Sequence, residues 1–296
     1  MYLLLSFGNA PKAEAGLFVI DSNEKQVKLP LRFKDPADFL NAENIDRTDL
    51  SNMQISGSGQ FSPSELDALI DKLGQDNLII IDLREESHGF INDMAVSWYA
   101  KGNAGNKGKS LSEIQNEELA SLHGLQQKKS VSANYIIEKE EGIIQKIMPV
   151  PIFISSAYTE DALCQRKNIS YFRLPITDHC RPADDQVDAF IHLIKTKGKT
   201  SKFHVHCRGG KGRTATIFMM YDMLLNADKL SMEAIADRQK KITDYDLFYI
   251  LPKEHWKYRT RLERVEFLKN FYLFCKENLS KKNISWSSWI KKRNSS

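Results

Sequence analysis

One stretch of thirteen residues constrains the fold of this chain more than any other: "HVHCRGGKGRTAT", from His204 to Thr216. A strand-like segment, residues 203–206, runs into it, and a helical pattern begins near Thr214. The three glycines between them let successive backbone N–H groups turn inward and form a nest for an anion. The N-terminus of the helix adds partial positive charge at the same place. Strand, glycine-rich loop and helix in this order predict an anion-binding loop at the edge of a sheet.

The side chains of this loop suit nucleophilic attack on a phosphate ester. Positive charge around Cys207 favours its thiolate, which can attack phosphorus. Arg213 presents a planar fork that can hold two phosphate oxygens. The Thr214 hydroxyl can donate to the thiolate or to the departing phosphocysteine sulfur. The competing interpretation is a structural cysteine before an ordinary loop, and the strand, the glycines and the helix together disfavour it.

The rest of the chain alternates between strand and helix patterns. Apolar strand-like runs occupy residues 77–83, 150–154, 171–174 and 203–206. Helical patterns occupy residues 63–73, 183–196, 214–225, 231–241 and 260–278. This alternation predicts an α/β core. A length of 296 residues with 42% hydrophobic content is enough for one large domain, or for one domain with a smaller companion.

Two local signals refine this prediction. Ser62, Pro63 and Glu65 form a capping-box pattern that marks the start of the first helix. Residues 100–149 fit an α/β core less well, because a polar Gly/Lys/Asn loop is followed by weak alternation over residues 129–147. We therefore expect a small β-rich insertion here, joined by part of the N-terminal segment.

Composition narrows the class of ligand and the compartment. Forty-two Lys and Arg against 38 Asp and Glu give a net charge of +4, which suits an anionic ligand without resembling a nucleic-acid-coating protein. No apolar run is long enough to cross a bilayer. Residues 1–7 are apolar but lack the basic start of a signal peptide. Cys164, Cys180, Cys207 and Cys275 show neither disulfide-framework nor metal spacing, which favours a reducing compartment, with export by another route as the alternative.

A general acid is required, because an alkyl alkoxide is a poor leaving group and must receive a proton. Asp178 follows a strand-like stretch and precedes Pro182, in a polar loop. Its rivals are Asp184, Asp185 and Asp188. The first two suit the N-terminal turn of the following helix. From the residues alone, Asp178 and its rivals are equally matched.

Further charges collect at two places. Lys257, Arg261 and Arg264 are spaced i, i+4 and i+7, so they share one side of a helix and could form a basic rim, or simply a solvated face. Asp82 and Arg84 end a strand on the edge where α/β sites open, where they could steady the cysteine loop or be ordinary loop charges.

The cysteine stretch resembles the signature loop of the protein-tyrosine-phosphatase superfamily, His-Cys-x5-Arg-Thr/Ser. Other stretches resemble the bacterial cysteine phytases, which are tyrosine-phosphatase-like inositol polyphosphate phosphatases. These stretches are "ISGSGQFS" (55–62), "DLREESHGFINDMAVSWYA" (82–100), "ITDHCRPADDQVDAFI" (176–191), "DRQKKI" (237–242), "HWKYRTRLERV" (255–265) and "SWSSWI" (285–290).

The resemblance implies a tyrosine-phosphatase-like α/β core with a small, partly open β-barrel insertion domain. We expect the core at residues 35–100 and 150–296, and the small domain at residues 1–34 and 101–149. The resemblance also implies a phosphomonoesterase that needs no metal or other cofactor. Its expected substrate is myo-inositol hexakisphosphate (phytate), dephosphorylated through a phosphocysteine intermediate.

Residue by residue, the resemblance makes Cys207 the nucleophile, Arg213 the phosphate clamp and Asp178 the general acid, with Thr214 completing the catalytic set. His179 matches a substrate contact, and Lys257 and Arg264 match positions that hold further phosphates. The full set expected to bind substrate is Arg208, Gly209, Gly210, Lys211, Gly212, His179, Lys257, Arg264, Asp82 and Lys34.

The loop departs from the family pattern at two positions. Arg208 and Lys211 stand where family loops commonly carry an acidic and an apolar residue. This more basic loop is similar to that of the lipid phosphatases of the superfamily, so a phosphoinositide or phosphotyrosine phosphatase is the alternative function.

Two other classes are less favoured. An RNA 5′-triphosphatase would need a broad basic, aromatic-rich face, so no nucleic-acid partner is expected. A catalytically dead phosphate-binding module is disfavoured by the intact Cys207, Arg213 and Asp178. The sequence carries no indication of oligomeric state.

Overall fold

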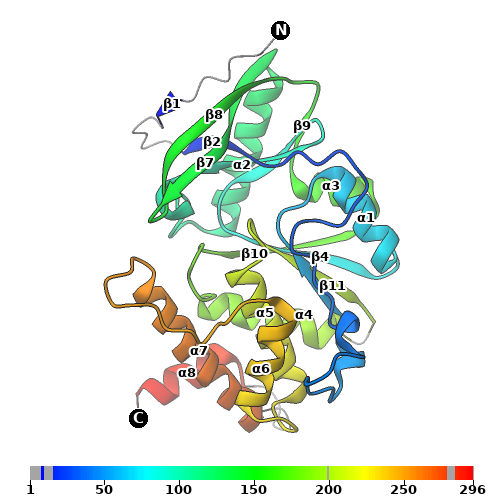
Figure 1. The fold of residues 1–296 in the computed structure, drawn as a ribbon, viewed down its shortest axis with the longest axis vertical. Helices are drawn as coiled ribbons and strands as arrows, with labels where there is room; N and C mark the ends of the chain where they lie inside the picture. The colour runs from blue at the N-terminus through cyan, green and yellow to red at the C-terminus, as the bar shows by residue number, and fades with distance from the viewer. Residues whose placement is uncertain (1–7, 10–15, 199, 279–283, 296) are drawn as a thin grey trace. The chain divides into compact units, whose positions relative to one another are not determined.

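The structure is a computed structural model that describes residues 8–9, 16–198, 200–278 and 284–295 (Figure 1). The apolar N-terminal residues 1–7 lie outside the described residues. Contacts divide the chain into two compact units. Unit 1 comprises Met1–Pro30, Gln60–Gln75 and Arg84–Tyr171, and unit 2 comprises Leu31–Gly59, Asp76–Leu83 and Phe172–Ser296. The predicted division into a core and a small domain stays a prediction.

Unit 2 is built around a four-stranded sheet in the order β10-β4-β11-β3. Its strands are β3 (Ile55–Ser58), β4 (Leu78–Arg84), β10 (Ser170–Ile176) and β11 (Lys202–His206). β11 runs parallel to both β3 and β4, and His206 lies in register with Ser58 and Asp82. Because parallel strands end at the same edge of a sheet, the segments that follow these three positions gather there.

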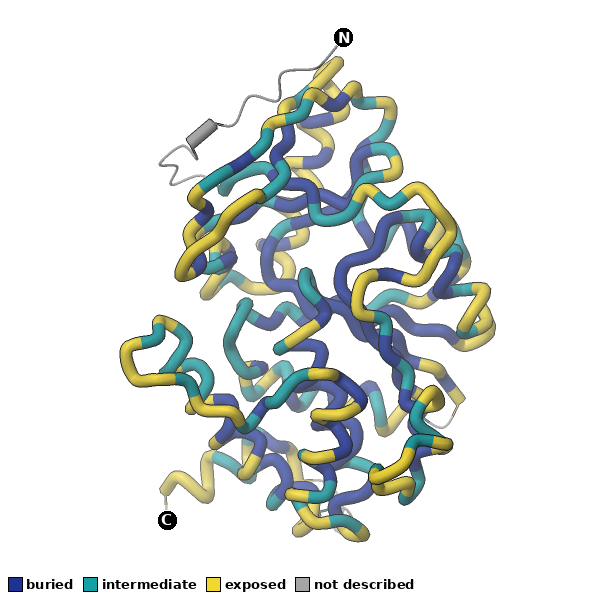
Figure 2. The backbone as a smooth tube through the Cα atoms, in the orientation of Figure 1, coloured by how far each residue is buried: buried dark blue, intermediate teal, exposed yellow. Residues whose placement is uncertain are grey.

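The helices of unit 2 supply most of its core. They are α4 (Asp184–Lys197), α5 (Gly212–Asn226), α6 (Met232–Thr243), α7 (Tyr258–Asn278) and α8 (Trp286–Asn294), with short 3₁₀ turns at Pro36–Phe39 and Leu50–Asn52. Every residue over 213–223 is buried, so α5 is the central helix of this core (Figure 2). Trp286 packs against Phe267, Phe271 and Phe274 of α7. The five predicted helices and the four predicted strand runs all fall on observed elements.

Unit 1 contains a seven-stranded sheet in the order β1-β8-β7-β2-β6-β5-β9. Its strands are β1 (Gly8–Asn9), β2 (Leu17–Ser22), β5 (His88–Ile91), β6 (Met94–Tyr99), β7 (Ser130–Glu140), β8 (Ile143–Phe153) and β9 (Ala157–Tyr158). The weakly alternating stretch of the sequence forms the long antiparallel pair β7–β8. Over the described residues the sheet is not closed, which agrees with the partly open form expected.

The helices of unit 1 are α1 (Pro63–Leu73), α2 (Leu111–Gln126) and α3 (Glu160–Arg166), with a 3₁₀ turn at Lys101–Asn103. The predicted capping box at the start of α1 is confirmed, since Ser62 and Glu65 exchange both bonds. α2 was not predicted. Its start carries the same signal, because Glu113 N–H donates to Ser110 Oγ and Ser110 N–H donates to a Glu113 oxygen at 2.7 Å.

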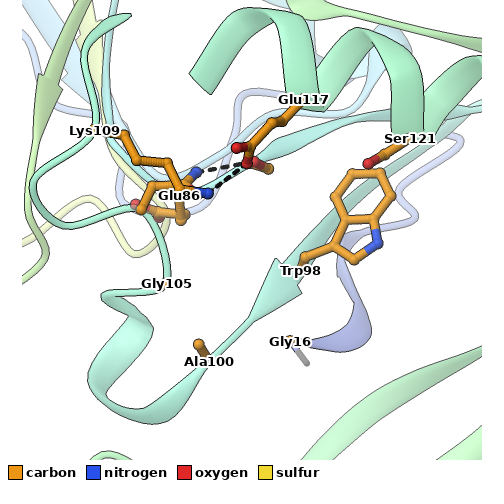
Figure 3. Close-up of a pocket in the computed structure, with 10 residues that line it drawn as sticks. Gly16, Glu86, Trp98, Ala100, Gly105, Lys109, Glu117 and Ser121 are labelled. Carbon is orange, nitrogen blue, oxygen red and sulfur yellow. Dashed lines mark hydrogen bonds and ion pairs between the residues drawn. The ribbon is translucent and has the colours of Figure 1, made fainter. Parts of the chain in front are cut away.

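A cavity of about 230 Å³ opens in unit 1 (Figure 3). Trp98 of β6 lies on its wall, and Lys109 pairs there with Glu117 of α2. None of the residues that line this cavity is among the predicted site residues. Over the residues described, no helix is long and apolar enough to span a membrane, and no group of three or more His, Cys, Asp and Glu side chains is placed to hold a metal ion.

A buried ion pair joins α5 to α6. Arg238 donates to both carboxylate oxygens of Asp222, and Gln239 and Asn226 donate to the same carboxylate. Both charged side chains are shielded from water, and Arg238 also donates to the Thr48 carbonyl at 2.8 Å. Such a pair contributes little net stability when it is intact, but removing one partner leaves the other charge buried and uncompensated.

We expect Asp222→Asn to lower the free energy of unfolding by about 3–5 kcal/mol, because it removes the buried counter-charge of Arg238 and leaves only the more exposed Asp46 carboxylate, 3.8 Å away. Urea unfolding followed by circular dichroism measures the change. Lys229→Met is the control, since it breaks the solvent-exposed pair between Lys229 and Asp49 and should leave the urea midpoint unchanged. Equal losses in the two variants would contradict this account.

Candidate active site

The cysteine loop lies at the edge of the unit 2 sheet where three parallel strands end. Cys207 directly follows β11, and α5 begins five residues later at Gly212. The Cys207 side chain is packed into this edge, with only 4% of the residue exposed. The positive end of a fifteen-residue helix therefore faces the loop that carries the thiol.

Gly210 fixes the shape of the loop. Its φ of +62° is a left-handed conformation that glycine adopts without strain. A Cβ at this position would lie 2.4 Å from the Gly59 nitrogen and 2.6 Å from the Ser58 carbonyl carbon. The end of β3 and the middle of the loop thus pack backbone to backbone, and only glycine fits between them.

The hydroxyl of Thr214 links the thiol to that same strand end. Its Oγ1 lies 3.3 Å from Cys207 Sγ and 3.4 Å from the Ser58 carbonyl oxygen. The hydroxyl has one proton, which it can donate to either acceptor at a time. The structure therefore places Thr214 where a sulfur that gains negative charge can receive a hydrogen bond.

Arg213 is held in place by backbone carbonyls. Its Nη1 donates to Ile176 at 3.1 Å and to Leu83 at 3.3 Å, at the ends of β10 and β4. Its Nη2 lies 3.4 Å from a carboxylate oxygen of Asp178. The predicted clamp and the predicted acid therefore lie in contact, at the first turn of α5.

Asp178 differs from its rivals in what surrounds it. Asp184 accepts from Trp286 and from Arg181, and Asp188 accepts from the Ser287 backbone. Asp184 also lies in the first turn of α4, as expected of a helix-start carboxylate. These hydrogen bonds hold Asp184 and Asp188 in the contact between α4 and α8, whereas Asp178 faces Arg213.

His179 adopts a left-handed backbone conformation with φ of +68°, and its N–H donates to the Asp178 carboxylate at 3.0 Å. Its ring meets Trp256 edge-on at 4.9 Å between ring centroids. Burial lowers the pKa of His179 to about 4, although the neighbouring Asp178 carboxylate opposes the shift. The imidazole is therefore neutral near pH 7 and offers one donor and one acceptor.

The short segment 31–34, which we call the strap, holds the outer side of the loop. Arg32 donates to the Gly209 carbonyl at 2.9 Å. The buried Lys34 ammonium donates to the carbonyls of Gly210 and Thr243 at 3.0 and 2.9 Å. Burial lowers the pKa of Lys34, and the nearby Cys207 opposes that lowering. Lys34 thus lies beside the loop with its ammonium donating to backbone carbonyls, and its predicted contact with substrate stays a prediction.

Asp82 lies beneath the loop rather than at its surface. It is fully buried in β4, 3.3 Å from Arg173 Nε and 4.0 Å from His206 Nε2. The structure surrounds its carboxylate with protein groups, so its contact with substrate stays a prediction.

Sequence reasoning missed His204, which lies two positions before His206 on β11. Its Nδ1 and Nε2 lie 2.9 and 3.0 Å from the hydroxyls of Ser56 and Ser58 on β3. Because Ser58 gives its own proton to the Gly59 carbonyl at 2.7 Å, it accepts from His204 Nε2. The ring therefore fixes the strand end against which Gly210 packs. The signal in the sequence was Ser-x-Ser in one buried strand and a histidine in β11, the strand that pairs with it in the sheet.

Arg264 of α7 bridges the acid loop and the cysteine loop. Its Nη2 donates to the Cys180 carbonyl at 2.9 Å, and its Nη1 would lie 3.0 Å from a Cβ added at Gly212. Burial lowers the pKa of this guanidinium. The predicted helical relation of Lys257 and Arg261 is confirmed, because Arg261 N–H donates to the Lys257 carbonyl at 2.9 Å.

The remaining predicted cations are more accessible. Lys257 lies just before α7 with its ammonium 4.6 Å from the centre of the Trp256 ring. Lys211 is exposed and Arg208 is half-buried. The structure therefore brings Cys207, Arg213, Thr214 and the half-buried Asp178 into one cluster. Of the cations expected to bind substrate, Lys257, Lys211 and Arg208 lie closer to solvent, whereas Arg264 and Lys34 are buried.

Known proteins provide an independent comparison. The family model of the PTP-like phytases matches residues 81–225, and the description of that family reads "Inositol hexakisphosphate". The effector protein hopD2 of Pseudomonas syringae pv. tomato is 28% identical over 246 residues, which cover 81% of this chain and 52% of that protein.

Two solved structures share the fold. The PTP-like myo-inositol phosphatase of Mitsuokella multacida, in complex with myo-inositol-(1,3,4,5)-tetrakisphosphate, is 30% identical with a TM-score of 0.87, covering 96% of this chain and 49% of that one. A PTP-like phytase of Bdellovibrio bacteriovorus is 28% identical with a TM-score of 0.74, covering 95% and 96%. The chain spans about half the length of hopD2 and of the Mitsuokella protein. By its motifs, its fold and these matches, this chain belongs to the family of protein-tyrosine-phosphatase-like phytases.

Proposed function

We propose that the protein is a cysteine-dependent phosphomonoesterase that removes phosphates from myo-inositol hexakisphosphate through a phosphocysteine intermediate. The observation that supports this most strongly is the cluster of Cys207, Thr214, Arg213 and Asp178 at the first turn of α5. The inositol tetrakisphosphate bound to the Mitsuokella relative supports the same class of substrate.

In the first step, the Cys207 thiolate attacks phosphorus and the bond to the inositol oxygen breaks. Asp178 gives its proton to that oxygen, so an alcohol leaves. The loop amides and the Arg213 fork hold the three equatorial oxygens as their charge redistributes. Arg213 is already held by the Leu83 and Ile176 carbonyls, so its fork needs little reorganisation.

In the second step, a water molecule attacks the phosphocysteine. The Asp178 carboxylate accepts a proton from this water, inorganic phosphate is released, and the sulfur leaves as thiolate. Thr214 Oγ1 can donate to that sulfur as its charge develops. Asp178 thus returns to its protonated state and the cycle closes without any redox partner.

The alternative is a phosphoinositide or phosphotyrosine phosphatase. The charges around the loop, Arg208, Lys211 and Lys257, favour a substrate with several phosphates over phosphotyrosine, because a single phosphate is served by the loop itself. A phosphate-release panel of phytate, phosphoinositides, a phosphotyrosine peptide and an aryl phosphate, run with a chelator present, tests the choice. Absence of turnover on the whole panel would instead favour a phosphate-binding module.

Replacement of the nucleophile should separate turnover from binding. We expect Cys207→Ser to abolish phosphate release while phytate binding, measured by calorimetry, is retained, because backbone N–H groups and Arg213 make the nest. Cys164→Ala, which alters another buried thiol, should keep the wild-type rate. A Cys207→Ser enzyme with roughly a tenth of the wild-type rate would exclude the covalent route.

Replacement of the acid should depend on the leaving group. We expect Asp178→Asn to slow phytate hydrolysis by about 10²-fold or more, and to slow an aryl phosphate less, because a phenolate leaves with little protonation. The basic limb of the pH–rate profile should disappear in this variant.

Asp185→Asn is the matched control, since Asp185 is an exposed first-turn residue of α4. It should keep the wild-type rate on both substrates. If Asp178→Asn slowed both substrates equally, the acid would be another residue.

The accessible cation Lys257 should matter only for substrates with several phosphates. A charge-assisted hydrogen bond contributes about 1.5–3 kcal/mol, so we expect Lys257→Ala to raise KM for phytate about ten- to a hundredfold. KM for an aryl phosphate should barely change, and added salt should weaken phytate binding more in the wild type than in the variant. Lys269→Ala, an exposed cation further along α7, is the control. Equal effects on both substrates would exclude a phosphate contact.

A further inference from the structure

The segment between α6 and α7, residues 244–257, exposes apolar side chains. It forms a loop that projects beside α7 (orange in Figure 1), and apart from the buried Leu247 its residues are exposed or half-exposed (Figure 2). Tyr249 is 58% exposed, Ile250 41% and Trp256 37%. A soluble polyanion needs cations around the loop, but it gives no reason to expose an isoleucine and a tyrosine side by side.

This segment lies next to the candidate active site. Trp256 contacts His179, the neighbour of the proposed acid, ring to ring. The strap lies on the loop too, since the Leu31 carbonyl accepts from Gly59 N–H at 2.8 Å and Arg32 reaches Gly209. The Leu31 side chain is 64% exposed. Apolar side chains thus accompany both the acid loop and the cysteine loop.

Cations alternate with these apolar side chains. Lys253 and Lys257 belong to the projecting segment, where Glu254 is the one acidic residue of positions 249–257; Asp244 and Asp246 lie at its other end, next to α6, and Asp246 is paired with Lys240. On the strap and the loop, Arg32 and Lys211 are both exposed. Positions 249–257, together with Leu31, Arg32 and Lys211, therefore combine tyrosine, tryptophan and aliphatic side chains with four cations and one acidic residue.

This combination matches the chemistry of an anionic lipid surface. Tyrosine and tryptophan favour the interface between headgroups and acyl chains. Each Lys or Arg near an acidic bilayer strengthens binding by about fivefold, and buried aliphatic side chains add to this. The segment 244–257 projects as a loop (Figure 1), which suits shallow insertion between lipid headgroups.

We propose that this rim, defined as Leu31, Arg32, Tyr249, Ile250, Lys253 and Trp256, docks on the surface of an anionic lipid bilayer. Docking brings the cysteine loop to the headgroup layer, where it can meet phosphomonoesters anchored in the membrane. The inference that the rim docks on a bilayer rests on the composition of this surface alone. The inference that docking presents phosphomonoesters to Cys207 rests on the proposed phosphatase function.

The test is sedimentation of the full chain with vesicles of phosphatidylcholine, alone or with 30% phosphatidylserine. The Cys207→Ser variant is used so that no turnover intervenes. We expect binding to the anionic vesicles that weakens as salt is added. Tyr249→Ala/Ile250→Ala should weaken it about tenfold, and Lys253→Glu should weaken it further.

The matched control is Ile137→Ala/Phe153→Ala, which removes two exposed apolar side chains from β7 and β8 of unit 1. It should bind vesicles like the parent protein. In the background with Cys207 intact, Tyr249→Ala/Ile250→Ala should hydrolyse soluble phytate at the wild-type rate, so loss of docking and loss of catalysis are read separately.

Three outcomes would overturn the proposal. One is no binding to phosphatidylserine vesicles at low salt, and another is equal binding by the rim variant and the control variant. The third is binding to an acidic polypeptide such as poly-glutamate that depends on Tyr249 and Ile250 without binding to vesicles, which would make the rim a protein-docking surface.

Discussion

The candidate active site depends on one close approach, that of the Gly210 backbone to the end of β3. Without a side chain at Gly210, the loop lies directly on Ser58 and Gly59, and this contact sets where the thiol and the loop amides lie. Several buried groups serve the same contact from other directions. His204 binds the hydroxyls of Ser56 and Ser58 on one side, and Lys34 donates to the Gly210 carbonyl on the other. A nest for phosphate needs fixed amides, so rigidity here is a condition for the proposed chemistry.

The cations around this rigid loop form two layers, an inner one that is buried and an outer one that is exposed to solvent. The inner cations, Arg213, Arg264 and Lys34, are shielded from water and bonded to backbone carbonyls, and burial lowers the pKa of both Arg264 and Lys34. Carbonyl dipoles compensate a desolvated cation only in part, so an anion that enters the loop gains from each of them. The outer cations, such as Lys211 and Lys257, act through solvent and are weakened by salt.

Local signals in the sequence were enough to locate the loop and most of the elements around it. A glycine-rich turn between a buried strand and a helix is a short-range pattern, and so is the capping box that starts α1. The helix α2 was missed although Ser110 and Glu113 carry the same capping signal, because the weak alternation over residues 129–147 led us to expect a β-rich insertion over the whole region 100–149. The burial of Asp82 could not be read from the chain, since it depends on the distant partner Arg173.

We infer that the two layers of cations have separate tasks. The inner layer acts on the phosphate that is cleaved, and the outer layer contacts the rest of the substrate. The residues proposed to cleave one phosphomonoester, Cys207, Arg213, Thr214 and Asp178, form one cluster at the first turn of α5, and this cluster would treat any accessible phosphate alike. Discrimination between soluble and lipid-held inositol phosphates must then come from outside that cluster, from side chains that meet the rest of the substrate. Those side chains are exposed, so substitutions there alter little packing and cost little stability. Substrate preference can therefore shift at the rim while the proposed chemistry beneath it stays the same.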